Sequence, residues 1–226
     1  KIGSIGAPIW PDTGGGSAMG SAAERQQFLE KVKQTCEFGK VLREHGIRQY
    51  GSIRIDSADS PAHWAANPAG NMKKIIDTFE GMPEQLGFQA DLAHTYLFLL
   101  GYNADEHALV GKDHEEEEFW EAYGKMTKAL APWTIDFHVA QSNGTVFGSG
   151  SHDKTGRHCP ADAPDGKLDV VKCARYWLLD EEGQIRNNIQ HICWDGCMFP
   201  NATLEDPSTW NKVLALMLEI KEDIGA

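Results

Sequence analysis

The sequence lacks any long apolar run. Its most apolar stretch, YLFLLGY at residues 96–102, is far shorter than the roughly 20 residues that a membrane-spanning helix needs. The N-terminus, which opens on Lys1 rather than Met, also lacks the basic and apolar segments of a secretory signal. We therefore expect no membrane-spanning helix and no secretory signal.

Positive charge and cysteine are also scarce. The 226 residues include 21 Lys and Arg against 33 Asp and Glu, which gives a net charge of -12. Such a surface repels nucleic-acid phosphates and anionic lipids, so we expect neither nucleic acid nor membrane as a partner. The cysteines form an odd, scattered set, which is typical of free thiols in a reducing compartment: Cys36, Cys159, Cys173, Cys193 and Cys197. We expect a cytoplasmic enzyme.

Helix and strand patterns alternate along the chain. The capping box SAAE at residues 21–24 begins a helix that ends at Gly46. Its apolar stripe is predicted to contain Phe28, Leu29, Val32, Cys36, Val41 and Leu42. Further helices are predicted at 67–80, 115–130, 168–179 and 206–223, and strands at 47–55, 87–91, 132–141 and 189–196. This order is typical of βα units around a parallel sheet, and we expect one domain over residues 1–226.

Three predicted strands end in a side chain that can bind a metal. These residues are Asp91, His138 and Asp195. Because the C-terminal ends of parallel strands face the same way, we expect the three side chains to converge. Two carboxylates and one imidazole suit a divalent cation such as Mn²⁺, Mg²⁺, Co²⁺ or Zn²⁺. For each aspartate there is an alternative role, since Asp at a strand exit also caps the following helix.

Two further segments offer polar groups near this predicted site. His94 follows Asp91 by three residues, which favours contact with a substrate hydroxyl or carbonyl at the same strand ends. A long loop at residues 142–167 follows His138, and loops of this length are usually functional or disordered. Its candidate donors to a bound sugar are His152, Lys154, Arg157 and His158; a surface excursion is the alternative.

The segment CWDGC at residues 193–197 admits a zinc site. Cys193 and Cys197 could bind zinc together with Cys159 and His158. The surrounding apolar strand instead favours buried thiols, which is the interpretation we prefer.

The motifs GFQADLAHT, IDFHVAQ and ICWDGC resemble the xylose isomerase-like TIM-barrel superfamily, the sugar phosphate isomerase/epimerase type. The resemblance implies a (β/α)₈ barrel with a divalent metal, most often Mn²⁺. Asp91 matches the sixth-strand ligand, and His94 matches its D-x-x-H partner that contacts substrate. His138 matches the seventh-strand ligand and Asp195 the eighth-strand acid. Arg157 matches an arginine that reaches the substrate.

The chain departs from that family pattern in two respects. The fifth-strand glutamate ligand has no counterpart, because residues 77–91 leave no room for a βα unit of roughly 30 residues. The whole chain is also shorter than a typical barrel of about 250 residues. We therefore expect an incomplete or shortened TIM barrel. Its open sheet edges predict a homo-oligomer, with a second small subunit as an alternative.

These features predict a metal-dependent isomerase or epimerase of a sugar or sugar derivative. The metal would stabilise an enediolate, Asp195 would move the proton and His94 would orient the oxygen. One alternative is a lyase that cleaves an oxidised (3-oxo) glycoside or C-glycoside on the same metal site. Another is a non-catalytic subunit with a defective site.

Overall fold

The structure is a computed structural model, and it places the chain in two compact units, residues 1–86 and 87–226. It describes residues 5–7, 16, 21–47, 53–54, 88–101, 108–111, 113–145, 158–189, 191–196 and 199–226. The prediction of a single domain remains a prediction.

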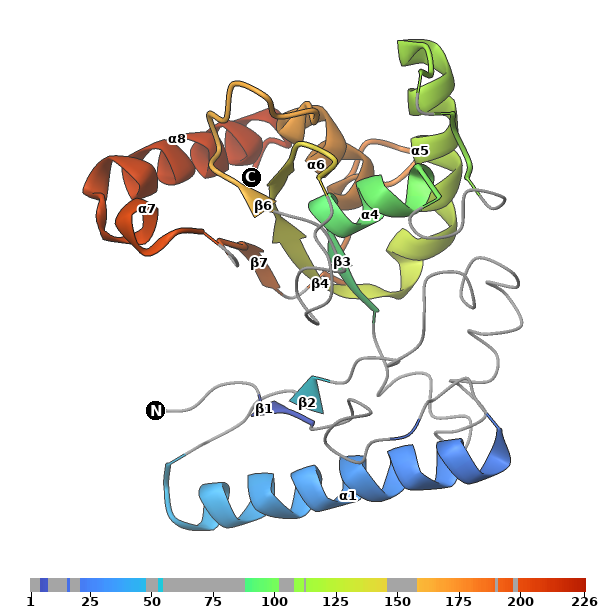
Figure 1. The fold of residues 1–226 in the computed structure, drawn as a ribbon, viewed down its shortest axis with the longest axis vertical. Coiled ribbons are helices and arrows are strands. Elements are labelled where there is room, and N and C mark those ends of the chain that lie inside the picture. Colours follow the sequence, from blue (N-terminus) through green and yellow to red (C-terminus); the bar gives the residue numbers. More distant parts are fainter. Residues whose placement is uncertain are drawn as a thin grey trace. The chain divides into compact units, whose positions relative to one another are not determined.

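The first unit contains a short βαβ arrangement (Figure 1). Strand β1 (Ile5–Gly6) pairs in parallel with β2 (Ile53–Arg54), and helix α1 (Ala22–Glu44) contacts both strands. The capping box predicted at the start of α1 is confirmed: Glu24 N–H donates to Ser21 Oγ, and Ser21 N–H donates to the Glu24 carboxylate at 2.7 Å. The helix ends before Gly46, which has a φ of 69°.

The apolar stripe of α1 is narrower than the sequence predicts. Phe28, Val32 and Leu42 are buried, but Val41 is 46% exposed. Neighbouring positions on a helix point about 100° apart, so Val41 and Leu42 do not both face the strands. The strand predicted at residues 47–55 is described only at Ile53–Arg54, and the helix predicted at 67–80 lies outside the described residues.

The second unit alternates strands with helices, as the sequence predicts. Its strands are β3 (Phe88–Asp91), β4 (Thr134–Val139), β5 (Gln141–Ser142), β6 (His158–Cys159) and β7 (His191–Trp194). Its helices are α4 (Leu92–Leu99), α5 (Glu116–Leu130), a 3-10 turn (Ala131–Trp133), α6 (Val170–Leu178), α7 (Asn201–Glu205) and α8 (Pro207–Asp223). Asp206 caps α8 as predicted, because its side chain accepts from Ser208 N–H at 2.8 Å.

Strands β3, β4 and β7 form a three-stranded parallel sheet in that order. Asp91 pairs in register with His138, and His138 pairs with Cys193. The described residues therefore form a mixed helix and sheet unit whose strands lie in the order in which they follow along the chain. The (β/α)₈ barrel remains a prediction.

The two faces of this sheet differ in chemistry. On one face, Ala90, Phe137 and Val139 are fully buried and join the core formed with helices α4, α5, α6 and α8. Successive strand residues point to opposite faces, so the other face carries polar side chains: Gln89, Asp91, Asp136, His138, His191 and Cys193. The apolar face packs against the helices, and the candidate site lies on the polar face.

A second, antiparallel strand pair extends beyond β4. Ser142 of β5 pairs with His158 of β6. The buried Gln141 side chain fastens the following segment, because its Oε1 accepts from Leu168 N–H at 2.9 Å and its Nε2 donates to Leu168 O at 3.0 Å. Gly166 is required beside it, since a Cβ there would lie 2.7 Å from Gln141 Cδ. These contacts fix β6 beside the end of β4.

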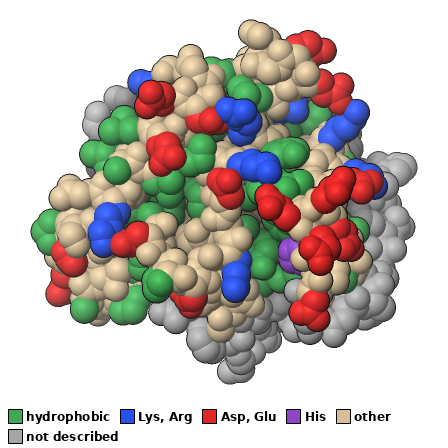
Figure 2. Space-filling model, turned by 90° about the horizontal axis from the view of Figure 1, so that it is seen from above, with side chains coloured by type: hydrophobic (Ala, Val, Ile, Leu, Met, Phe, Trp, Pro, Cys, Tyr) green, Lys and Arg blue, Asp and Glu red, His purple; other side chains and the backbone are tan. Residues whose placement is uncertain are grey.

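The surface carries charges of both signs. Figure 2 shows acidic side chains over much of one face, with basic side chains beside several of them. Pairs such as Lys125–Glu121 and Lys212–Asp162 join exposed side chains at 2.6 Å, and exposed pairs of this kind contribute little to stability. No described helix is long and apolar enough to cross a membrane.

Candidate metal centre

Asp91 lies where strand β3 becomes helix α4. Its Oδ1 accepts the backbone N–H of His94 at 3.0 Å, so the residue is the N-cap of α4. The capping role that the sequence left open is therefore real, but it uses one oxygen only. The other oxygen, Oδ2, is buried without a hydrogen-bond partner, and the residue is 5% exposed. Helix capping alone does not account for Asp91.

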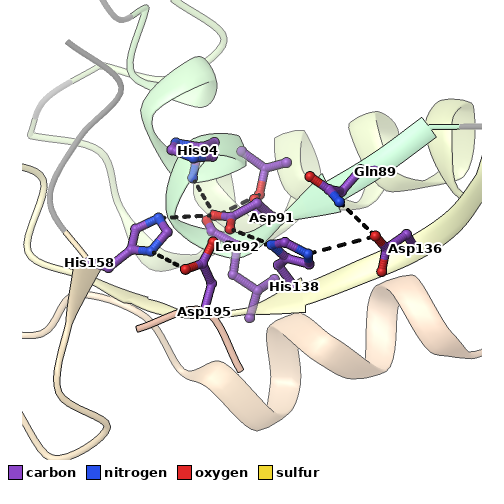
Figure 3. A network of polar contacts seen from close by, with 9 residues as sticks. Gln89, Asp91, Leu92, His94, Asp136, His138, His158 and Asp195 are labelled. Carbon is purple, nitrogen blue, oxygen red and sulfur yellow. Dashed lines mark hydrogen bonds and ion pairs between the residues drawn. The ribbon is translucent and has the colours of Figure 1, made fainter. Parts of the chain in front are cut away.

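His138 and Asp195 meet Asp91 at the same sheet edge (Figure 3). The His138 Nδ1 atom lies 3.1 Å from Asp195 Oδ2 and 3.7 Å from Asp91 Oδ2. Asp195 follows β7, and its backbone N–H donates to Val139 O at 2.9 Å, which fixes it beside β4. The ligand atoms of the three residues all lie within 4.8 Å of one another. The structure thus brings the three predicted metal ligands together.

A third carboxylate, that of Asp136, lies beside the other ring nitrogen of His138. The Asp136 Oδ2 atom is 3.7 Å from His138 Nε2 and accepts from Gln89 Nε2 at 2.6 Å. Metal-binding histidines usually have a carboxylate or carbonyl at the other ring nitrogen, which fixes the ring orientation. Asp136 therefore positions His138 with Nδ1 toward Asp91 and Asp195. With Cys193, these two residues also form a separate group that could hold a metal.

His158 also lies in this site, although the sequence did not predict it as a partner of Asp91 and Asp195. It is 1% exposed, with Nε2 at 3.6 Å from Asp91 Oδ1 and Nδ1 at 3.5 Å from Asp195 Oδ1. Its position depends on the β5–β6 pairing, which joins residues 16 positions apart. No spacing in the sequence indicates that pairing, so the sequence placed His158 only among loop donors or cysteine ligands.

Of the residues predicted to contact the substrate, the structure places His94 near the site. His94 lies in the first turn of α4, half-buried, with its ring centroid 5.1 Å from that of His158. It can also form a metal-binding group with Asp91 and His158. Three of the four loop donors lie outside the described residues: His152, Lys154 and Arg157.

The prediction of buried thiols is correct for Cys159 and wrong for Cys193. Cys159 is buried in the β5–β6 pair, whereas Cys193 is exposed. Cys193 lies on the polar face of β7, which is an outer strand of the described sheet, so no described layer covers it. Cys197 lies outside the described residues. The metal-binding groups of the described part do not combine Cys159 with Cys193.

The carboxylates around His138 and His158 raise the pKa of both imidazoles. Burial lowers the pKa of His138, but the hydrogen bond to Asp195 and the nearby Cys193 and Asp91 outweigh it and raise the pKa to about 10. Burial also lowers the pKa of His158, and Asp195 with Asp91 raises it overall. A proton on His138 therefore offsets part of the negative charge of the two carboxylates, and a bound cation would replace that positive charge.

No protein-family model, curated protein or solved structure matches the chain. The case for a metal therefore depends on the donor atoms. Asp91 Oδ2 and both ring nitrogens of His158 are buried without hydrogen-bond partners, and buried polar atoms in that state are costly unless a ligand satisfies them. Carboxylate oxygens and imidazole nitrogens together suit Mn²⁺, Mg²⁺, Co²⁺ or Zn²⁺. The residues present fit such a cation.

Proposed function

We propose that this chain is a metal-dependent isomerase or epimerase of a sugar or sugar derivative. The observation that carries the proposal is the convergence of Asp91, His138 and Asp195 at the C-terminal ends of three parallel strands. Ligand sites in sheets of parallel strands lie at this edge. The three residues would hold the cation, with Mn²⁺ expected.

When bound, the cation supplies positive charge that stabilises the enediolate formed from a carbonyl and its neighbouring hydroxyl. Asp195 is the candidate base, because its side chain is 21% exposed and its Oδ1, which lies 3.5 Å from His158 Nδ1, is not hydrogen-bonded to that ring. Oδ1 would take the proton from the hydroxyl-bearing carbon next to the carbonyl. It would return the proton to the former carbonyl carbon, which gives the isomer, or to the opposite face of the same carbon, which gives the epimer.

His94 would orient the substrate. Its half-buried ring lies beside His158 at the start of α4, and its backbone is held by Asp91. An imidazole at this place can donate to or accept from a hydroxyl or carbonyl oxygen. Asp136, held by Gln89, would keep His138 in its binding orientation.

The test is proton exchange at the substrate carbon. The protein is loaded with Mn²⁺ and incubated in D₂O with a panel of aldoses, ketoses and their phosphates, and NMR follows loss of the C–H signal and formation of isomers. We expect exchange and a new isomer with at least one sugar, and neither with Asp195→Asn. Release of an aglycone from a 3-oxo glycoside, without isomer formation, would instead support the lyase.

A further inference from the structure

We infer that His158 is a fourth ligand of the same cation, so that the centre consists of two aspartates and two histidines. The inference rests on the proposed function, because it assigns a further residue to the metal site on which that function depends.

The first support is that His158 and His138 contact the same two carboxylates. His138 Nδ1 lies 3.1 Å from Asp195 and 3.7 Å from Asp91, each time at Oδ2. His158 lies 3.5 Å from Asp195 and 3.6 Å from Asp91, each time at Oδ1. Each carboxylate therefore has one imidazole at each of its oxygens (Figure 3).

The second support is the range of these distances. Octahedral coordination with bonds of about 2.1 Å places neighbouring ligand atoms ~3.0 Å apart and opposite ones ~4.2 Å apart. Three of the four imidazole–carboxylate distances, 3.1, 3.6 and 3.7 Å, join possible ligand atoms and lie within that range. The fourth, 3.5 Å, starts from His158 Nδ1, the ring nitrogen that does not coordinate. Asp91 is the ligand that belongs both to the group with His138 and Asp195 and to the group with His158, so a shared cation would draw the two imidazoles together around it.

The third support is the environment of the His158 ring. Only 1% of its side chain is exposed, and neither ring nitrogen has a hydrogen-bond partner. A buried imidazole without partners is destabilising. Coordination of the cation by Nε2, beside Asp91, satisfies one nitrogen. Nδ1 then donates toward Asp195, in the arrangement of carboxylate, histidine and metal that fixes ring orientation in metal sites.

The fourth support is that the backbone holds His158 in place. The β5–β6 pairing and the Gln141 hydrogen bonds to Leu168 fix the backbone on both sides of the ring. With Asp91, His138, Asp195 and His158 as protein ligands, a cation that takes six ligands would still have room for the carbonyl and hydroxyl oxygens of the proposed substrate.

The test counts histidine rings that bind a diamagnetic probe cation, Zn²⁺. The full chain, with ¹⁵N-labelled histidine, is titrated with Zn²⁺, and long-range ¹H–¹⁵N spectra report which ring nitrogens become coordinated. His138→Gln and His158→Gln identify the rings, and His45→Gln, an exposed residue at the end of α1, is the control. We expect one Zn²⁺ per chain and two coordinated rings, one of which disappears in each of the first two variants.

We further expect His158→Gln to weaken Zn²⁺ binding by about 100-fold or more, beyond the effect of losing an outer-shell partner. His45→Gln should bind as the parent protein does. A single coordinated ring in the parent protein would overturn the inference even if His158→Gln does not fold.

Three other results would each overturn the inference, and the number of bound Zn²⁺ ions and of coordinated rings tells them apart. One bound Zn²⁺ with His138 as the only coordinated ring would overturn the inference and leave the proposed metal site intact. Two bound Zn²⁺ ions, with His94 and His158 on the second, would overturn it in favour of a separate site. Absence of Zn²⁺ binding would overturn both the inference and the proposed function.

Discussion

At the scale of single residues, the two oxygens of Asp91 have different partners. Oδ1 caps helix α4, and Oδ2 is buried beside His138 without a hydrogen bond. Asparagine is as good an N-cap as aspartate, but it carries no charge and is a weaker ligand for a divalent cation. The capping role and the metal role can therefore be separated by one substitution.

We predict that Asp91→Asn keeps α4 and loses the metal. The matched control is Asp169→Asn, because Asp169 caps α6 through the same contact, accepting Lys172 N–H at 3.0 Å, and belongs to no metal-binding group of the described residues. Titration calorimetry with Mn²⁺ should show binding weakened at least 100-fold in Asp91→Asn only, with circular dichroism unchanged in both. Equal Mn²⁺ affinity in the two variants would contradict the site.

The raised pKa of His138 predicts how metal affinity depends on pH. In the metal-free protein this ring keeps its proton up to about pH 10, whereas an ordinary histidine loses it near 6.5. A cation must displace that proton, so affinity should rise by about tenfold per pH unit for each proton released. Measured between pH 6 and 9, the affinity should rise throughout. A plateau above pH 7 would show that the carboxylates do not hold the proton there.

At the scale of helices and strands, the sequence predicts the structure correctly where a feature depends on contacts between residues that are close along the chain. The capping box at Ser21, the Asp206 cap of α8 and the alternation of strands and helices after residue 87 were all predicted. So was the convergence of the three strand-end side chains, because it follows from parallel pairing. Each depends on spacing that the sequence displays.

The β5–β6 pairing could not be predicted in this way. Two-residue strands carry no periodic pattern, and the partners Ser142 and His158 are held by distant contacts such as Gln141 with Leu168. For the same reason the exposure of Cys193 was missed, since an apolar strand sequence does not reveal whether it lies at the edge of a sheet.

Helix α8 offers a matched test of which face is buried. Ile220 is 3% exposed and belongs to the core, whereas Leu218, two residues earlier, is 55% exposed. We expect Ile220→Ala to lower the free energy of unfolding by about 2–5 kcal/mol. Leu218→Ala should change it by about 0.5 kcal/mol or less. Urea unfolding measures both, and equal effects would contradict the described packing of α8.

At the scale of the whole molecule, the site joins segments that are far apart in the sequence. Its residues come from β3, β4, β6 and the end of β7, so a bound cation connects residues 91 to 195. A ligand that binds only the folded chain stabilises it by about 2.7 kcal/mol at 100 times the dissociation constant.

We therefore predict that metal removal lowers thermal stability. The midpoint of unfolding should rise with Mn²⁺ concentration and fall on addition of EDTA, as followed by circular dichroism. The Asp91→Asn variant should not respond to either treatment. A midpoint independent of Mn²⁺ in the parent protein would mean that the cation does not bind the folded chain.

The β5–β6 pair also has a consequence for altering this protein. The pair fixes Ser142 and His158 beside each other, so the chain between them starts and ends at fixed points. Loop-closure cost grows only slowly with length. A change in the number of residues between Ser142 and His158 should therefore cost the pair little and leave His158 beside Asp91 and Asp195.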